Sequence, residues 1–255
     1  MNYLEDMKLV YETAFKRTIQ RVKDNPIALF LPLIYGVIYT VAFYFLGLIS
    51  PMFGILGGFI PPIITSLILS SYFSILSDLN FYHRISFKNF GNTFQSYFGS
   101  IYSVYCVLIL ASWILPSLTY YDEKSLLIHL VLFVAFNPIA EIIYIRGDYY
   151  FESFKSSIEF MKDNILLWSF PLLLYFIVSK LLGVTWTNIV LDNFIIEIPL
   201  GRHLYSFLPL SIGIRNLTVL ILLIVTGFYT VFRGALFDIL HRSTRRKRAY
   251  MGGRL

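Results

Sequence analysis

The fold is decided by an uncharged stretch at residues 26–77, which reads PIALFLPLIYGVIYTVAFYFLGLISPMFGILGGFIPPIITSLILSSYFSILS and contains no Asp, Glu, Lys or Arg. A helix of about 20 apolar residues crosses a lipid hydrocarbon core about 30 Å thick. The stretch is therefore long enough for two membrane spans. Gly47, the Ser50-Pro51 pair and Gly54 are typical of a turn between them.

The composition extends this interpretation to the whole chain. Hydrophobic residues make up 57% of the sequence and charged residues 14%, against about 25% charged residues in ordinary soluble domains. Further apolar stretches predict spans at about 100–120, 125–145, 164–183 and 212–233. We therefore expect an all-α polytopic membrane protein with six transmembrane helices, in which residues 1–255 form a single integral membrane domain.

The positive residues predict how these spans are oriented. Of the 21 Lys and Arg, all but Lys124, Lys180, Arg202 and Arg215 lie in the terminal segments or in the two connections that follow even-numbered spans. Positive residues are enriched on the cytoplasmic side of membrane proteins. This distribution predicts a multi-pass protein of the cell membrane with both termini in the cytoplasm.

Two segments 139 residues apart share a pattern of identical residues. The first copy contains Phe15-Lys16, Ile19, Lys23-Asp24-Asn25 and Pro32-Leu33; the second contains Phe154-Lys155, Ile158, Lys162-Asp163-Asn164 and Pro171-Leu172. A repeat at fixed spacing indicates a duplicated structural unit. We expect three hairpins, each preceded by a cytoplasmic amphipathic helix, in units of about 8–78, 84–146 and 149–238.

Each copy has an Asn before the span and a Pro within it. Asn25 and Asn164 are expected to cap the helix that follows, and Pro32 and Pro171 to kink the two spans at matching depth. The first amphipathic helix, residues 3–23, carries an apolar stripe on one face. It is expected to lie in the headgroup plane or pack under the bundle rather than bind a partner, because neither arrangement needs a second protein.

Glu141 is the acidic residue placed clearly inside a predicted span. An intramembrane carboxylate marks a functional site by default, for moving protons or cations or for contacting substrate. However, Glu141 lies only about 7–8 Å along the helix axis from the span end at Arg146. We therefore favour a structural ion pair with Arg146 or Arg233 over a transport role, with Asn137 and His129 as polar companions in the same span.

A second polar feature is the serine stripe of the second span. Ser66, Ser70 and Ser74 recur at steps of four residues and so share one helical face. Small side chains allow helices to approach closely, and their hydroxyls can bond to helix carbonyls. We favour close packing over a polar conduit.

The C-terminal tail, residues 239–255, is basic. Its cluster predicts binding to anionic lipid headgroups, at about 1 kcal/mol for each charge near the surface, through Arg242, Arg245, Arg246, Lys247 and Arg248. Docking to an acidic cytoplasmic partner is the alternative. The longest irregular stretch, about residues 184–211, is typical of a functional or mobile loop.

The sequence carries no pattern that indicates catalysis. CxxC, HExxH, GxSxG and Walker motifs are absent, and the four His residues are scattered at positions 83, 129, 203 and 241. We predict no catalytic residue, metal site or cofactor. Nucleic acid is not expected as a partner, because the positive charge follows the membrane topology.

The repeated Phe-Lys, Asn and Pro pattern (Phe15, Lys16, Asn25, Pro32 and their counterparts) resembles a group of bacterial six-span integral membrane proteins. That group is similar to the membrane domain that precedes some glycerophosphodiester phosphodiesterases. The resemblance implies a six-span fold over nearly the whole chain and a bacterial inner membrane. It implies no phosphodiesterase activity, because 255 residues leave no room for the soluble catalytic barrel.

These observations favour a non-enzymatic scaffold or accessory subunit of a membrane complex. Such a subunit would contact other membrane subunits or copies of itself. The alternative is the permease subunit of a transporter, driven by a separate ATPase or by an ion gradient. An enzyme that acts on lipid within the membrane is the least supported class.

Overall fold

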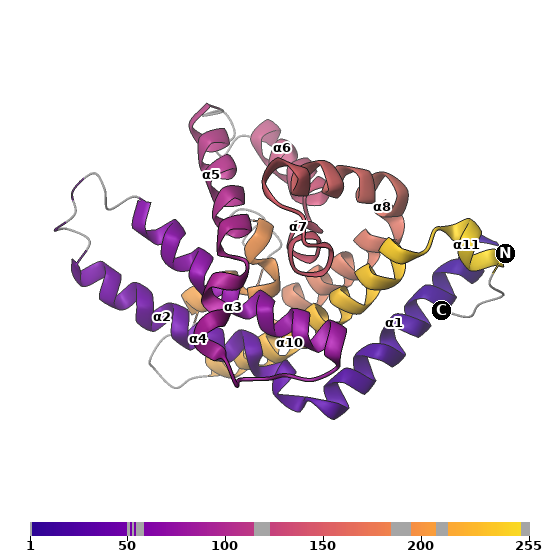
Figure 1. Cartoon of the computed structure of the whole chain (residues 1–255), viewed down its shortest axis with the longest axis horizontal. Helices are drawn as coiled ribbons and strands as arrows, with labels where there is room; N and C mark the ends of the chain where they lie inside the picture. Colours follow the sequence, from indigo (N-terminus) through magenta and orange to yellow (C-terminus); the bar gives the residue numbers. More distant parts are fainter. Residues whose placement is uncertain are drawn as a thin grey trace.

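The uncharged stretch at residues 26–77 forms two packed helices in the computed structural model of the chain. α2 (Leu31–Ile49) follows a short 3-10 helix, η1 (Pro26–Phe30), and contacts α3 (Ile60–Tyr82). The structure describes residues 2–49, 52, 54, 59–114, 123–184, 195–207 and 214–250, and this part of the chain is helical without any strand (Figure 1). The prediction of an all-α fold is confirmed for these residues.

Four of the described helical stretches are long and apolar enough to cross a membrane. They are Pro26–Ile49, Ile60–Tyr82, Tyr150–Leu181 and Leu217–Arg242. A fifth candidate is formed by α4 (Phe90–Ser96) and α5 (Phe98–Ile114), which are bent by 42° relative to each other. Six uninterrupted spans are not confirmed.

The span predicted at residues 125–145 is broken. α6 (Glu123–Ala135) ends before Asn137-Pro138, and the chain continues as the short α7 (Ile139–Glu141) and a π-helical turn, η4 (Ile142–Arg146). Proline lacks the N–H that an α-helix needs and its ring crowds the preceding turn, so the helix stops at Pro138. Gly147, with φ +80°, then ends the π-helical turn in a left-handed conformation that glycine adopts without strain.

The two copies of the sequence repeat fold differently. α1 (Tyr3–Asp24) ends before Asn25-Pro26, whereas α8 (Tyr150–Leu181) continues through the corresponding Asn164 without interruption. Position 165 is an isoleucine, whose N–H keeps the helical hydrogen bond that Pro26 lacks. The expectation of a separate amphipathic helix before each hairpin is therefore wrong for the third unit.

The expected capping role of the two Asn residues is also wrong. Asn25 makes no side-chain cap to η1; it instead donates to the carbonyl of His83 at 2.9 Å and accepts from the amide of Ile85 at 3.0 Å. Asn164 lies inside α8 and donates to the carbonyl of Phe160 at 3.1 Å. Asn25 thus fixes the loop between α3 and α4 to the end of α1.

The prolines do not create matching kinks either. Pro32 is the second residue of α2, at the junction with η1, whereas Pro171 lies inside the continuous α8. The two prolines therefore occupy different positions in their helices, although they match in the sequence repeat.

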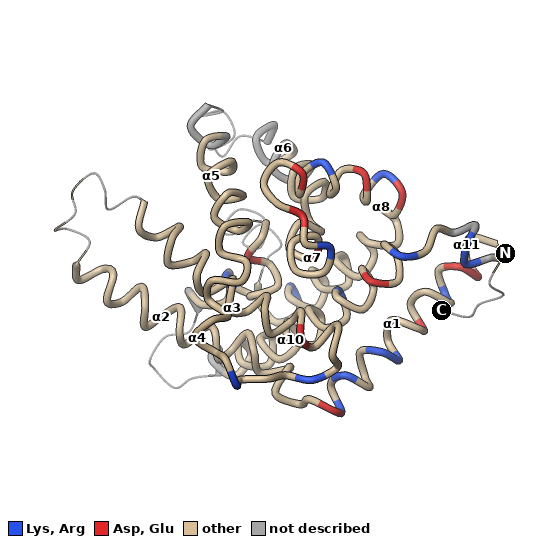
Figure 2. The backbone as a smooth tube through the Cα atoms, viewed as in Figure 1, with Lys and Arg blue, Asp and Glu red and all other residues tan. Residues whose placement is uncertain are grey.

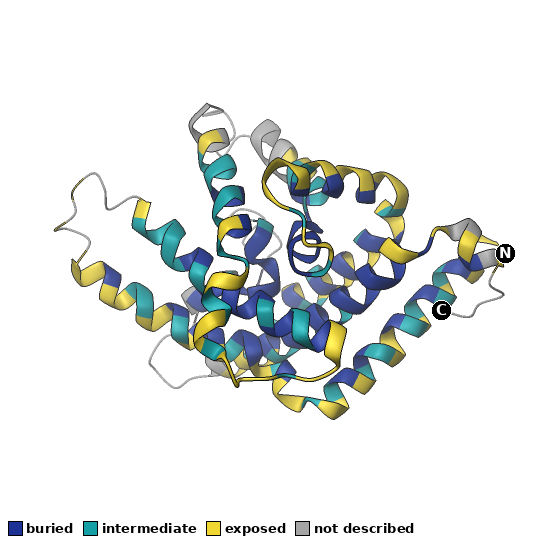
Figure 3. Ribbon diagram, viewed as in Figure 1, coloured by how far each residue is buried: buried dark blue, intermediate teal, exposed yellow. Residues whose placement is uncertain are grey.

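α1 packs along α10 (Ile214–Arg242), burying a helical face made of Asp6, Val10, Ala14, Thr18 and Arg21 (Figure 3). This face is rotated from the predicted apolar stripe, in which Leu4 is exposed. The helix therefore packs against the bundle through small and charged side chains.

The charged residues gather on one side of the bundle. Figure 2 shows Lys, Arg, Asp and Glu along α1, in the first half of α8 and towards the C-terminus, whereas α2 and α5 carry none. We call the segments 3–24, 83–88, 146–163 and 238–250 the charged side. The first and last described helices, α1 and α11 (Arg245–Tyr250), both lie there, and Asp6 and Arg248 join them.

Helix α10 contacts η1 at very short range. A Cβ atom built on Gly227 would lie 2.3 Å from the carbonyl oxygen of Leu29, a backbone atom that cannot rotate away. Gly227 is thus the residue that lets α10 contact the backbone of the first span.

We predict that Gly227→Ala lowers the thermal unfolding temperature of the detergent-solubilised protein, because overpacking of this kind costs about 1–3 kcal/mol. Gly47→Ala in α2 is the matched control, since a Cβ there meets nothing within 4 Å. Equal unfolding temperatures for the two variants would contradict the close approach.

Candidate functional site

A buried ion pair joins the broken helix to α10. Arg233 Nε donates to Glu141 Oε1 at 2.7 Å and Arg233 Nη2 donates to Glu141 Oε2 at 2.6 Å. Both side chains are fully enclosed, with exposures of 1% for Arg233 and 0% for Glu141. The two parallel bonds give the fork geometry that suits an arginine–carboxylate pair.

The surroundings of the pair use the groups that the helix break exposes. Arg233 Nη2 also donates to the main-chain carbonyl of Asn137 at 2.8 Å, and the Asn137 side chain accepts from Trp168 Nε1 at 2.9 Å. The guanidinium carbon of Arg233 lies 5.1 Å from the ring centre of Trp168 and 5.6 Å from that of Tyr229. Arg233 therefore bonds across the break while its faces rest on aromatic rings.

The chain between α8 and α10 enters the bundle. Residues 195–207, which we call the re-entrant segment, form two 3-10 helices, η5 (Ile195–Leu200) and η6 (Arg202–Phe207). Tyr72 and Thr230 both donate to the carbonyl of Pro199, at 2.8 and 2.9 Å. Thr230 is 16 residues into α10, about 24 Å along its axis, so the segment reaches deep between the helices.

A second ion pair, with a buried carboxylate and a partly exposed arginine, lies in the re-entrant segment. Arg202 Nη1 is 2.7 Å from each carboxylate oxygen of Glu197, and the hydroxyl of Tyr105 donates to the same carboxylate. Glu197 is fully buried, and the Arg202 guanidinium lies over the ring of Tyr39 at 5.3 Å. The irregular stretch predicted at 184–211 is thus replaced at residues 195–207 by two 3-10 helices that enter the bundle, while 185–194 and 208–213 lie outside the described residues.

One face of α10 connects the two pairs. Thr226, Thr230 and Arg233 follow each other at steps of four and three residues and are all buried, so they line the side that meets the re-entrant segment and the helix break. Two nitrogen donors at this point, Arg233 Nη1 and Asn137 Nδ2, have no hydrogen-bond partner in the described part of the chain. These donors could bind water or a small polar molecule.

The other polar residues predicted inside the membrane are placed elsewhere or not described. Arg146 pairs with Asp148 at 3.1 Å rather than with Glu141. The side chain of His129 lies outside the described residues. Ser70 donates to the carbonyl of Thr93 at 2.9 Å and accepts from the amide of Tyr97 at 2.8 Å, which joins α3 to α4.

The rest of the serine stripe does not continue as a polar row. Ser66 is buried and has no hydrogen-bond partner among the described residues, and Ser74 is half-buried. The hydroxyl that extends the contact with α4 is that of Ser71, which lies 2.7 Å from Thr93 Oγ1. The serine face of α3 thus packs closely against a neighbouring helix.

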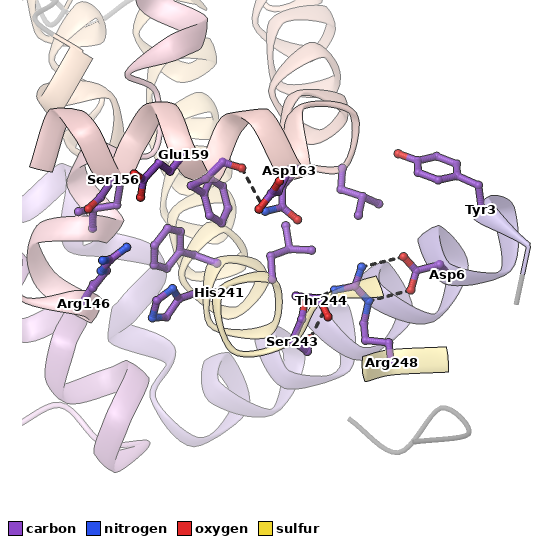
Figure 4. A pocket seen from close by; sticks show the side chains of 16 residues that line it. Tyr3, Asp6, Arg146, Ser156, Glu159, Asp163, His241, Ser243, Thr244 and Arg248 are labelled. Atoms are coloured by element: carbon purple, nitrogen blue, oxygen red, sulfur yellow. Dashed lines mark hydrogen bonds and ion pairs between the residues drawn. The ribbon is translucent and has the colours of Figure 1, made fainter. Parts of the chain in front are cut away.

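The basic tail is partly folded against the bundle. Arg248 Nε and Nη2 donate to the two carboxylate oxygens of Asp6, both at 2.7 Å, and both side chains are buried (Figure 4). The prediction that Arg248 binds lipid headgroups is therefore wrong, because its guanidinium faces inward. Arg242 pairs with Asp238 at 2.6 Å, Lys247 is exposed, and the side chains of Arg245 and Arg246 lie outside the described residues.

This pairing closes one edge of a cavity on the charged side. The cavity measures about 670 Å³ and lies between the start of α1, the first half of α8 and the end of α10 (Figure 4). Its wall carries charges of both signs, including Arg146, Glu159 and Asp163.

Two sequence patterns that belong to no known motif indicate buried polar residues. Glu197 stands within the apolar hexapeptide Ile195–Leu200, which is unusual for an exposed loop. Thr226, Thr230 and Arg233 form a polar stripe at helical spacing within an otherwise apolar span. Both patterns indicate burial of polar groups against each other.

Chemically, the site consists of buried carboxylates that pair with arginines. No group of three or more His, Cys, Asp or Glu residues that could hold a metal ion occurs within the described residues. Comparison of the chain with protein-family models, with curated proteins and with solved structures finds no match. The described residues define an all-helical protein in which four or five helices are long and apolar enough to span a membrane. The resemblance to phosphodiesterase membrane domains stays a prediction.

We predict that Glu141→Gln destabilises the protein by about 3–5 kcal/mol, because it leaves Arg233 buried without a counter-charge. Glu141→Leu combined with Arg233→Met should recover most of this loss. Thermal unfolding in detergent measures the effect, with Glu159→Gln as the control, since Glu159 forms only an exposed pair with Lys155. A Glu141→Gln protein as stable as this control would show that the pair does not hold the bundle.

We also predict that Asp6→Asn releases the tail, because Arg248 loses its buried carboxylate. Trypsin should then cleave at residues 245–248 about tenfold faster, the change expected for each 1.4 kcal/mol of lost docking free energy. Glu12→Gln, which removes an exposed carboxylate from the same helix, should leave the rate unchanged. Equal cleavage rates in the two variants would contradict the docked tail.

Proposed function

We propose that this protein is a non-enzymatic integral membrane protein of the cell membrane that acts as a scaffold or accessory subunit of a membrane complex. In this proposal six spans, arranged as hairpins related by an internal repeat, cross the bilayer, with α6, α7 and η4 together forming one broken span. The charged side and both termini face the cytoplasm. Other membrane subunits, or further copies of the chain, are its partners.

The distribution of charge supports this orientation. The charged side contains most of the Lys and Arg residues, and the opposite tips of the bundle at α2 and α5 contain no charged residue (Figure 2). Retention of positive residues in the cytoplasm is the strongest sequence rule for membrane topology. The exposed basic residues, Arg242 and Lys247 among them, can contact anionic headgroups.

The observation that carries the proposal is an exposed aromatic surface on the charged side. It consists of residues from the end of α3, the following loop and the start of α8, which are between 48% and 73% exposed: Tyr82, Phe87, Tyr149, Tyr150 and Phe151. Tyr97, which follows α4, donates to Ser77 of α3 and to the carbonyl of Tyr144 just before α8, so it links the two segments. Exposed aromatic groups of this kind mark sites where another protein docks.

The paired charges of the core are consistent with a structural role. Glu141, Glu197 and Asp6 each hold an arginine through two hydrogen bonds or a short ion pair. A transported ion would have to displace these partners and leave a buried charge unpaired, which is costly. The pairs instead hold the helices in one arrangement, as a scaffold requires.

The alternative function, the permease subunit of a transporter, is favoured by one specific feature. A broken helix and a re-entrant segment meet inside the bundle, where α7 contacts η5. Transporters build substrate sites from interrupted helices of this kind, and the free donors of Arg233 and Asn137 could contact a substrate. In this reading a separate ATPase or an ion gradient supplies the energy.

Isolation in mild detergent tests the proposal. We predict that the wild-type chain purifies with a partner at fixed stoichiometry or as a self-associated species, and that Tyr149→Ala with Phe151→Ala loses this association. The double variant should fold normally, because both side chains are exposed. Leu4→Ala, which shortens an exposed apolar side chain on α1, should retain the partner.

Three outcomes would change the conclusion. A stoichiometric ATPase in the wild-type preparation would support the permease function. Retention of the partner by the double variant would show that the aromatic surface faces headgroups instead. A wild-type species with the mass of a single 29.6 kDa chain would contradict the subunit role.

A further inference from the structure

A second cavity on the charged side contains a buried arginine that forms no ion pair within the described residues. The cavity measures about 600 Å³ and lies where the ends of α1, α3 and α10 meet. Its wall includes Arg17, Arg21, Asn80, Asp238 and Arg242. It is separate from the Glu141–Arg233 pair and from the cavity of Figure 4.

Arg21 is the residue that distinguishes this cavity. It is 4% exposed, and its Nη2 donates to the main-chain carbonyl of Asn80 at 3.1 Å. Among the described residues no carboxylate lies within ion-pair distance of Arg21, and its Nε has no hydrogen-bond partner. Burial accordingly lowers the pKa of the guanidinium below its ordinary value.

The wall contains two carboxylates, and neither forms an ion pair with Arg21. Asp238 accepts from Arg17 at 3.3 Å through one oxygen and pairs with Arg242 at 2.6 Å through the other. Asp24 accepts from the side-chain amide of Gln20 through both oxygens. Arg17 and Arg242 therefore share Asp238, which acts on Arg21 only at longer range.

Asn80 provides the second observation. It is 6% exposed, and neither its Nδ2 nor its Oδ1 has a partner in the described part of the chain. An unpaired buried polar group costs about 1–3 kcal/mol, and a buried charge without a partner costs more. Two such side chains in the wall of one cavity indicate that a ligand completes their bonds.

We propose that this cavity binds a phosphate group, held by Arg21 Nε and Asn80 Nδ2. An anion supplies the negative charge that Arg21 lacks, and phosphate oxygens accept from guanidinium and amide donors at once. Asn80 Oδ1 accepts a hydroxyl next to the phosphate. The phosphate belongs either to a lipid headgroup, since the cavity lies at the ends of two candidate spans, or to a soluble ion.

Thermal unfolding separates these two sources. In detergent, inorganic phosphate is compared with chloride at equal ionic strength; in nanodiscs, phosphatidylcholine alone is compared with phosphatidylcholine containing phosphatidylglycerol. At a hundredfold excess over the Kd, a ligand of this kind should raise the unfolding temperature by about 5 °C or more. Phosphate also stabilises proteins through exclusion from their surface. A shift in the wild-type protein alone is therefore not enough, and the comparison with the variants below tests whether the cavity is the binding site.

Asn80→Ala is the decisive variant. It keeps the main-chain carbonyl that Arg21 contacts and removes only side-chain atoms that have no partner, so the unliganded protein should be as stable as wild type or slightly more stable. We expect it to lose the larger part of the ligand-induced shift. Arg21→Gln should lose the shift as well, and Lys16→Gln, which removes a side chain that is 74% exposed on the same helix, should keep it.

The outcomes are distinct. A shift with inorganic phosphate that Asn80→Ala abolishes identifies a soluble anion. A shift with phosphatidylglycerol alone that Asn80→Ala abolishes identifies a lipid phosphate. Equal shifts in wild type and Asn80→Ala under both conditions, or an equal loss in Lys16→Gln, would overturn the proposal.

Discussion

The bond between Arg233 and Glu141 is the interaction on which the rest of the bundle depends. Pro138 stops the fourth apolar segment inside the structure, and the broken helix leaves main-chain carbonyls that must find donors away from water. Arg233 donates to the carbonyl of Asn137 and to both oxygens of Glu141. A single guanidinium therefore satisfies the break, neutralises the carboxylate and fixes α7 against α10. Its flat faces rest on Trp168 and Tyr229, which ties α8 to the same point.

The same requirement governs the other buried charges. Arg202 neutralises Glu197 within the re-entrant segment, and Arg248 neutralises Asp6 where the two chain ends meet. Arginine suits all three places because its donors form a rigid fork and it keeps its charge when buried. Arg21 departs from this rule within the described residues, since it is buried and donates to a main-chain carbonyl but forms no ion pair. This difference is the reason for proposing that an anion binds beside it.

Much of the architecture could be predicted from the sequence. The uncharged stretch predicts helices at residues 26–77, and the positions of Lys and Arg predict the gathering of charge that the structure shows on one side.

The site could be predicted only in part. Glu141 stands out in the sequence because a carboxylate among apolar residues needs a partner, and the sequence offers Arg146 and Arg233 as the two candidate ion-pair partners. The choice between Arg146 and Arg233 depends on where Pro138 redirects the chain, which residue spacing alone does not give. Glu197 and Arg202 escaped notice because a long connection is expected to lie at the surface, whereas this one folds into the bundle.

The sequence repeat shows how a single residue can separate two copies of one unit. Asn25 and Asn164 occupy equivalent positions, but the first precedes Pro26 and the second Ile165. Because proline offers no N–H, α1 ends there, the chain turns through η1, and Asn25 is free to bind the loop after α3. With isoleucine the helical hydrogen bonds continue, and α8 becomes one continuous helix that extends from the charged side through the apolar region.

The first copy thus gains a separate helix that packs along α10 and brings Arg21 to the cavity proposed to bind phosphate. The second copy gains a continuous helix whose start presents the exposed aromatic side chains. Divergence at this one junction therefore gives the two parts of the charged side different surfaces, and our two proposals assign a small anion to one and a larger partner to the other.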